Sequence, residues 1–130
     1  MRSVCTALLL LCLAASAAAQ DSHLLIVAGL GGAPHYSDQF HAWATRLLDA
    51  AADRYKLSAE QMIYLAERPD RDPERIDGRS TRENVEAAIA TLAARARPND
   101  KVFIFLIGHG SFTGGESRFN LPGPDLTAED

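Results

Sequence analysis

The sequence has very little cysteine, and what it has lies near the N-terminus. Its 130 residues include only Cys5 and Cys12. We interpret residues 1–19 as a secretory signal peptide, so both cysteines would leave with it on export. The exported chain would then contain neither a disulfide nor a thiol nucleophile of its own.

The signal peptide is predicted from three adjacent features. Arg2 is a short basic start, the apolar segment VCTALLLLCLA follows, and Ala17 and Ala19 form an A-x-A cleavage signal. The apolar segment is too short and wrongly flanked for a membrane-spanning helix. Bulky Leu11 stands where a lipoprotein signal would have a small residue before Cys12. We therefore predict a secreted or periplasmic protein with no membrane span after signal removal.

The chain also lacks an excess of basic residues. Without Arg2, 12 basic residues face 17 acidic ones, a net charge of about −5. The sequence has no basic patch, so nucleic acid is not an expected partner. Apolar residues make up 47% and charged residues 23%, as in ordinary globular domains. The length is enough for one domain with a modest core.

Two glycine-based motifs are incomplete. Ser111 lacks the G-x-S-x-G elbow of α/β-hydrolases, because His109 and Thr113 occupy the glycine positions. A phosphate-binding G-x-G-x-x-G starting at Gly29 would need glycine where Pro34 stands, and the P-loop lysine is also missing. Serine hydrolases of that fold and nucleotide-binding proteins are therefore disfavoured.

Metal-ligand spacing is absent as well. His23, His35 and His41 form no ligand pattern, and no cysteine supports them. We expect each to be structural or exposed to solvent, and we expect no metal and no other cofactor.

Apolar segments alternate with helical patterns in a regular way. Strands are expected at residues 23–28, 61–67 and 101–107, and the first helix is expected to begin at Ser37 or Asp38. This order predicts an α/β fold, a three-layer sandwich with a mainly parallel sheet. Segment 101–107 is apolar on both faces, which favours a central strand covered by helices.

The second helix carries start and stop signals. Ser80 and Glu83 have capping-box spacing, with Thr81 as the competing N-cap. Arg95 and Arg97 are expected in the last turn, where they would complement the helix dipole. Between strand and helix, residues 67–79 carry five acids and four bases. They are expected to form a solvated connection, with a wall of a substrate cleft as the alternative.

The glycine-rich loops locate the chemistry. Residues 29–32 (GLGG) and 108–111 (GHGS) each follow a predicted strand, so both should open at the carboxyl edge of the sheet. A lone histidine in such a turn is more often structural. The glycines on both sides of His109 nevertheless let backbone N–H groups approach a substrate closely, which favours a functional role.

Residues 80–112 (STRENVEAAIATLAARARPNDKVFIFLIGHGSF) resemble the caspase-like group of cysteine peptidases, which includes caspases, metacaspases and legumains. In that group a capped helix leads into an apolar strand that ends in His-Gly. Residues 118–130 (RFNLPGPDLTAED) resemble the segment after the histidine, and residues 24–51 are similar to the start of the legumain domain. The resemblance covers nearly all of residues 23–130.

The resemblance implies roles for named residues. His109 would assist a thiol and protonate the leaving amine, and the N–H of Gly110 would help hold the oxyanion. The cysteine would follow the next strand, about 50 residues beyond His109 and so beyond Asp130. Residues 20–130 are thus expected to be the N-terminal part of a caspase-like domain, incomplete at the C-terminus, with Thr127 as the N-cap of a starting helix. A peptide or protein would be the substrate.

The chain departs from legumains at two weak candidates for substrate binding. Gly31 stands where legumains have an asparagine thought to orient the histidine, and Ser37 stands where they have an arginine of the specificity pocket. Two hypotheses therefore stay open: an exported cysteine endopeptidase, and a catalytically inactive caspase-like domain used for binding or scaffolding.

Overall fold

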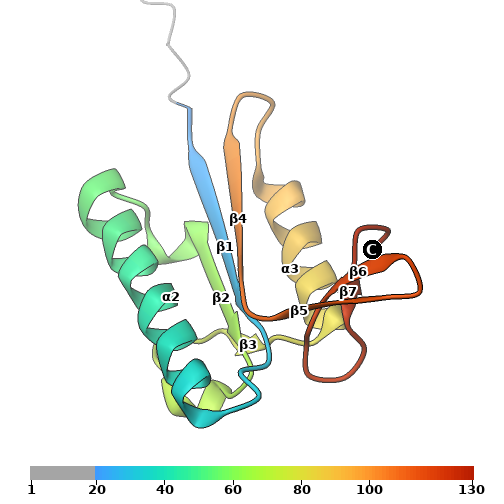
Figure 1. The fold of residues 1–130 in the computed structure, drawn as a ribbon. Helices are drawn as coiled ribbons and strands as arrows, with labels where there is room; N and C mark the ends of the chain where they lie inside the picture. Colours follow the sequence, from blue (N-terminus) through green and yellow to red (C-terminus); the bar gives the residue numbers. More distant parts are fainter. Residues whose placement is uncertain (1–19) are drawn as a thin grey trace, which may run out of the picture.

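The computed structural model describes residues 20–130. The expected signal peptide, with both cysteines, lies outside the described residues. The chain folds into a four-stranded parallel sheet with one long helix on each face, and a small antiparallel sheet follows it (Figure 1).

The elements follow one another along the chain as β1 (Ser22–Ala28), α2 (Pro34–Tyr55), β2 (Met62–Ala66), β3 (Gly78–Arg79), α3 (Arg82–Arg95), β4 (Lys101–Ile107), β5 (Gly110–Thr113), β6 (Glu116–Phe119) and β7 (Leu126–Thr127). Short 3-10 turns lie at Ala59–Gln61 and Pro69–Arg71. The main sheet has the order β3-β2-β1-β4, and β5, β6 and β7 form the antiparallel sheet. The predicted α/β fold with a mainly parallel sheet is confirmed.

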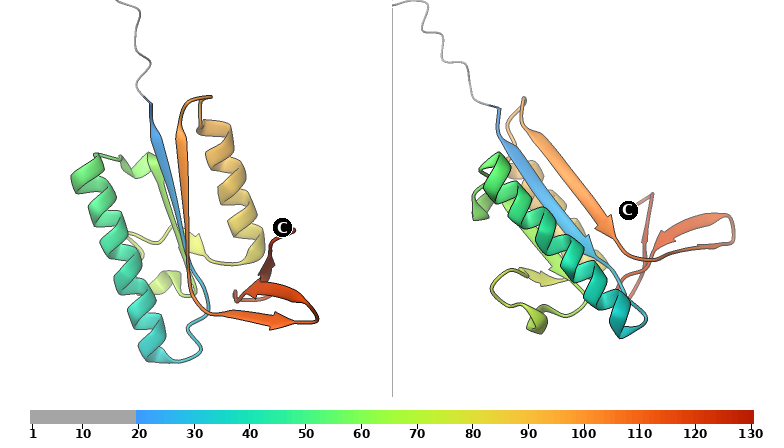
Figure 2. Two further views of the ribbon diagram at one scale, coloured as in Figure 1. Left: turned by 45° about the horizontal axis from the view of Figure 1, so that its top comes forward. Right: turned by 60° about the vertical axis from the view of Figure 1, so that its left-hand side comes forward.

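The two helices cover opposite faces of the sheet, as Figures 1 and 2 show. Successive side chains of a strand point to opposite faces. Leu24, Ile26 and Ala28 of β1 accordingly pack in a cluster with α2. Leu25 and Val27 pack in a second cluster with α3. Central strand β1 is therefore buried on both sides, as its unbroken apolar sequence requires.

Strand β4 lies at an edge of the described sheet, next to β1 alone. Its apolar sequence favours a central strand in a complete domain, and a chain that ends at Asp130 is expected to leave one edge of this strand without a partner. Helix α2 contacts β1, β2 and β4, whereas α3 contacts β1 and β2, so the faces of β4 are only partly covered. Its side chains from Val102 to Leu106 are each 41–48% exposed. An apolar strand with an open edge and half-exposed side chains is unusual for a natural sheet.

Helix α2 begins earlier than predicted, at Pro34 rather than at Ser37 or Asp38. Proline is well suited to the first helical position, because its fixed φ matches the helix and its missing N–H would have no partner there. Residue Ala33 at the N-cap offers no side-chain oxygen, and the first turn has no acidic residue. This helix therefore lacks a cap within its own segment.

Helix α3 uses the alternative N-cap. The Thr81 hydroxyl accepts a hydrogen bond from the Asn84 N–H, whereas Ser80 is fully buried and its N–H donates to the Ala66 carbonyl. The predicted Ser80 capping box is therefore wrong. The helix ends at Arg95, so Arg97 lies beyond the last turn.

The end of the chain also differs from the expectation. Thr127 belongs to β7, and the residues after it form a turn instead of a helix. Its hydroxyl accepts from the Glu129 N–H and donates to the Asp130 carboxylate. Within residues 20–130, no helix is both long and apolar enough to cross a bilayer.

Candidate functional site

The candidate site lies at the carboxyl edge of the parallel sheet. Strands β2, β1 and β4 are parallel neighbours, so the segments that follow them leave the sheet at the same edge. Figure 1 shows the first turn of α2 at this end of the molecule. The loops after β1 and β4 are joined there by a hydrogen bond from the Gly29 N–H to the Ile107 carbonyl, 2.9 Å long. The predicted shared edge is therefore present, and its two glycine loops are adjacent.

His109 lies between β4 and β5, with its ring against the first turns of α2. Its ring centroid lies 4.6 Å from that of Tyr36 and 5.2 Å from that of Phe40, in edge-to-face contacts. The backbone is fixed by a hydrogen bond from the Asn120 N–H to the His109 carbonyl. Neither ring nitrogen has a hydrogen-bond partner among residues 20–130. The half-buried imidazole is thus held by packing, with both nitrogens open to a reacting group.

The glycines that flank His109 serve different purposes. A Cβ on Gly108 would lie 2.8 Å from the ring of Phe119, so packing alone excludes a side chain there. Gly110 pairs with Phe119 in the register of β5 and β6. In the adjacent pair, His109 and Asn120, the Asn120 N–H donates to the His109 carbonyl. Alternation along an antiparallel ladder then turns the N–H of Gly110 away from β6. This N–H has the freedom that an oxyanion donor requires.

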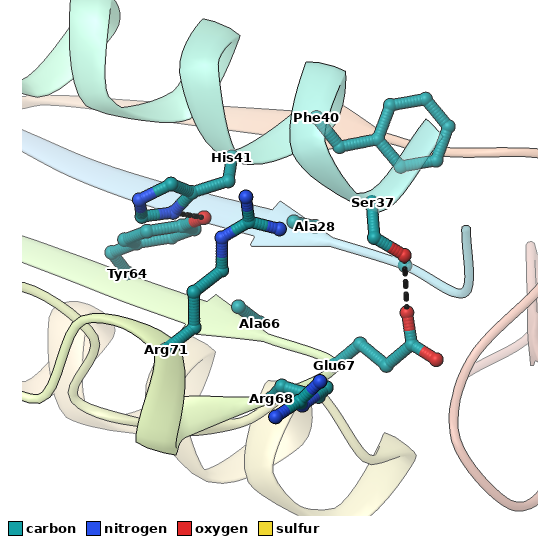
Figure 3. Close-up of a pocket in the computed structure, with 10 residues that line it drawn as sticks. Ala28, Ser37, Phe40, His41, Tyr64, Ala66, Glu67, Arg68 and Arg71 are labelled. Carbon is teal, nitrogen blue, oxygen red and sulfur yellow. Dashed lines mark hydrogen bonds between the residues drawn. The ribbon is translucent and has the colours of Figure 1, made fainter. Parts of the chain in front are cut away.

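Gly31 and Ser37 meet at a third residue, Glu67, as Figure 3 shows for Ser37. The Gly31 N–H donates to Oε2 of Glu67 at 3.2 Å, and the Ser37 hydroxyl donates to the same oxygen at 3.1 Å. Glu67 directly follows β2, so its carboxylate comes from a neighbouring strand. It supplies the negative charge that the first turn of α2 lacks.

The contact between Gly31 and α2 leaves no room for a side chain at residue 31. A Cβ on Gly31 would lie 2.2 Å from Oγ and 2.7 Å from the backbone nitrogen of Ser37. No side chain fits unless the loop moves. The chain therefore has no space at residue 31 for an asparagine that could orient His109.

A polar network lies beneath Ser37, between α2 and β2 (Figure 3). The Tyr64 hydroxyl and Nδ1 of His41 share a hydrogen bond of 3.1 Å, and Nε2 of His41 lies 3.5 Å from the Asp72 carboxylate. Burial raises the pKa of Tyr64 to about 12. Burial, together with nearby Arg71, lowers the pKa of His41. The network ties the 67–79 segment to α2, so this segment is more than a solvated connection.

Two cavities share residues of this segment. The inner recess is about 30 Å³, a volume suited to water, and is bounded by Phe40, His41 and Tyr64. The outer cleft is about 550 Å³ and lies between the loop after β1, the start of α2 and residues 67–71. Ser37 and Glu67 line both cavities. Residues 67–71 thus form a wall of a cleft, the alternative considered for the predicted loop.

The remaining candidates take structural positions. His23 is buried, with Nε2 3.5 Å from the Asp100 carboxylate, and His35 is exposed in the first turn of α2. The Ser111 hydroxyl donates to Oδ1 of Asn120 at 3.1 Å. The described residues include no group of three or more His, Cys, Asp or Glu side chains that could hold a metal ion.

Glu67 is the residue of this site that sequence reasoning missed. It was counted within a charged connection because several acids and bases follow it. A usable signal was present, since Glu67 is the first charged residue after a buried strand. The rule that places sites at the carboxyl ends of parallel strands applies to β2 as well as to β1 and β4.

No protein-family model matches the sequence, and no curated protein or solved structure is significantly similar to it.

Proposed function

We propose that this chain is the histidine-bearing part of an exported, caspase-like or legumain-like cysteine endopeptidase. The observation that carries the proposal is the setting of His109. Its imidazole stands at the carboxyl edge of the sheet, is fixed by two aromatic rings, and has no hydrogen bond to either ring nitrogen from residues 20–130. A histidine with a purely structural role would more often spend a ring nitrogen on a protein partner, as His41 does with Tyr64.

The roles follow from the chemistry of thiol proteolysis. His109 takes the proton of the cysteine thiol, and the thiolate attacks the peptide carbonyl carbon. The N–H of Gly110 donates to the oxyanion that forms. His109 then gives its proton to the departing amine, leaving a thioester that water hydrolyses to release the acid and the thiol. No cofactor takes part in these steps.

The exposure of β4 supports the position of the missing cysteine. We propose a strand outside these 130 residues that pairs with the free edge of β4 and bears the cysteine at its carboxyl end. The thiol would then lie one strand spacing, about 4.8 Å, from the strand that carries His109. Such a strand, with its own helices, would also cover the apolar faces of β4. In this proposal residues 20–130 form an incomplete caspase-like domain.

The second candidate function is binding or scaffolding by an inactive domain of the same fold. The absence of cysteine from residues 20–130 favours it. Gly31 and Ser37, which differ from the legumain residues at these positions, favour it too.

The test uses the full-length protein, including the segment that follows residue 130, with a peptide library as substrate. We expect peptide hydrolysis that thiol alkylation abolishes and that His109→Ala reduces by at least about 1,000-fold. A peptide-derived electrophile should label one downstream cysteine stoichiometrically. Full activity after alkylation, or in the His109→Ala variant, would rule out the peptidase. Absence of hydrolysis and of labelling would favour the inactive domain.

A further inference from the structure

The outer cleft beside α2 contains a carboxylate with one oxygen available to accept a hydrogen bond. Glu67 uses one carboxylate oxygen, Oε2, to accept from both Gly31 and Ser37. The other oxygen, Oε1, has no hydrogen-bond partner among residues 20–130. In Figure 3 it points away from Ser37. The side chain is half-buried at the wall of the 550 Å³ cleft, so an incoming group can reach this oxygen.

The other charges around the cleft are paired. Arg71 lies 2.6 Å from the Asp38 carboxylate, and Arg68 lies 2.8 Å from the Asp70 carboxylate. Glu67 has no basic side chain within salt-bridge distance in the described part of the chain. The start of α2 offers about half a positive charge, which offsets only part of the carboxylate. The cleft therefore favours a cation.

The distance between Glu67 and His109 sets the length of the substrate side chain that would carry this cation. Strands β2 and β4 are separated by β1, so the residues that end them lie about two strand spacings, or about 10 Å, apart. Both groups lie on the α2 side, because His109 contacts Phe40 and Glu67 binds Ser37. A substrate residue whose carbonyl is held at His109 therefore needs a long side chain to reach Glu67. Aspartate and asparagine are too short.

Apolar residues lie between the two groups. Phe40 contacts the His109 ring and is itself buried, and partly exposed Leu30 lines the outer cleft. Backbone at Gly29 borders the inner recess without a side chain. Lysine and arginine have aliphatic stems that pack well on apolar surface while the charged end reaches a polar group.

We propose that the cleft binds an arginine or lysine side chain of the substrate, with Glu67 as the specificity-determining residue. The residue that it recognises immediately precedes the scissile bond. Oε1 of Glu67 accepts from the guanidinium or ammonium group, and Ser37 and the Gly31 N–H hold the carboxylate in place. This inference rests on the proposed peptidase function of the same site.

The first experiment measures cleavage by the full-length protein of peptides that differ only before the scissile bond. Arginine is compared with citrulline, its neutral analogue of nearly equal shape, and with asparagine. We expect kcat/KM for the arginine peptide to exceed that for the citrulline peptide by about 10- to 100-fold, as for a charged hydrogen bond. In Glu67→Gln the ratio should fall to about one, mainly by loss of the arginine rate. Equal rates for arginine and citrulline in the unmodified protein would overturn the proposal.

Matched variants separate charge from fold. Glu67→Gln keeps an oxygen acceptor for Gly31 and Ser37, so its melting temperature should stay close to that of the parent. Glu67→Asp keeps the charge but withdraws it by one methylene, and should retain a reduced preference for arginine. Glu86→Gln removes an exposed carboxylate of α3, on the opposite face of the sheet, and should change neither rate. An arginine preference that survives in Glu67→Gln would assign the recognition to another group.

Binding distinguishes failure of this proposal from failure of the peptidase proposal. In calorimetry with the His109→Ala protein, the arginine peptide should bind at least about 10-fold more tightly than the citrulline peptide, and Glu67→Gln should abolish the difference. Differential binding without any cleavage by the parent protein would keep the cation site and reject the peptidase. Cleavage of peptides with no difference in binding would keep the peptidase and reject the cation site.

Discussion

The ring of His109 meets the ring of Tyr36 edge-on, with 4.6 Å between their centroids and an interplanar angle of 89°. The contact joins the end of β4 to the first turn of α2. It orients the imidazole without using either of its nitrogens, because edge-to-face packing is a contact between ring faces and edges. Tyr36 is therefore a positioning residue for the proposed acid/base.

Replacing Tyr36 should show this role in the proposed full-length peptidase. Tyr36→Ala removes the ring, and we expect kcat to fall about 10-fold with little change in KM, because His109 loses its fixed orientation. Tyr36→Phe keeps the ring contact and should retain kcat within about twofold. Steady-state kinetics of both variants make the comparison. Equal loss in the two variants would assign the effect to the Tyr36 hydroxyl.

Gly31→Ala should destabilise the protein by about 1–3 kcal/mol, because the new Cβ would overlap Oγ and the backbone nitrogen of Ser37. Urea unfolding measures the free-energy difference. Gly78→Ala is the matched control, since a Cβ there would meet only Leu65 Cδ2, at 3.4 Å, and should cost much less. Similar losses in both variants would show that the overlap with Ser37 is not the cause.

Tyr64→Phe removes the hydroxyl that bonds His41, and should cost about 1 kcal/mol near neutral pH. Burial raises the pKa of Tyr64 from 10.0 to about 12. Its contribution is therefore fully present below pH 10 and is lost as the pH rises toward 12, because the unfolded chain ionises first. Between pH 9 and pH 12, the free energy of unfolding should fall more steeply with pH for the parent than for Tyr64→Phe. Parallel curves would contradict the assignment.

Asp100 should contribute to stability against acid. The backbone N–H groups of Arg97 and Asp21 donate to its carboxylate and lower its pKa from 3.8 to about 2. This contribution is present above pH 3.8 and is lost as the pH falls to about 2. Asp100→Asn should lower the melting temperature at pH 6 and flatten its decline between pH 4 and pH 2. A variant whose melting temperature falls as steeply with acid as the parent would exclude this residue as a cause.

Residues 20–130 expressed alone should be poorly soluble or partly molten, because β4 leaves one edge open and its apolar side chains half-exposed. Calorimetry should show no sharp melting transition. In the full-length protein, the β4 amides that point away from β1 should be strongly protected from hydrogen exchange. A sharp, cooperative transition for residues 20–130 would show that β4 is stable as an open edge.

The strands and the carboxyl edge of the sheet were predictable from the sequence, because both depend on the local pattern of apolar residues and glycines. The unbroken apolar segments of β1 and β4 and the glycines after them placed His109 correctly at the carboxyl edge. Strand order has no local signal, so the adjacency of β4 to β1 could not be predicted. The N-cap of α3 was decided by burial of Ser80, whose N–H pairs with Ala66, and spacing alone could not reveal that.

The site itself was harder to predict than the fold. The contact among Gly31, Ser37 and Glu67 joins residues from three segments, and it exists only after β1 and β2 pair. The weak candidates Gly31 and Ser37 came from the resemblance, while their common partner belonged to no recognised motif.

The contact between Ser37 and Glu67 has a consequence for folding. The Ser37 hydroxyl, near the start of α2, binds a carboxylate 30 positions later in the chain, so this contact cannot form until the loop between them has closed. Contacts of such long sequence separation form late, after the entropy of loop closure has been overcome. The closure of this loop and the assembly of the cleft are then one event. A nascent chain would carry no recognition cleft until that event, even with most of α2 already formed.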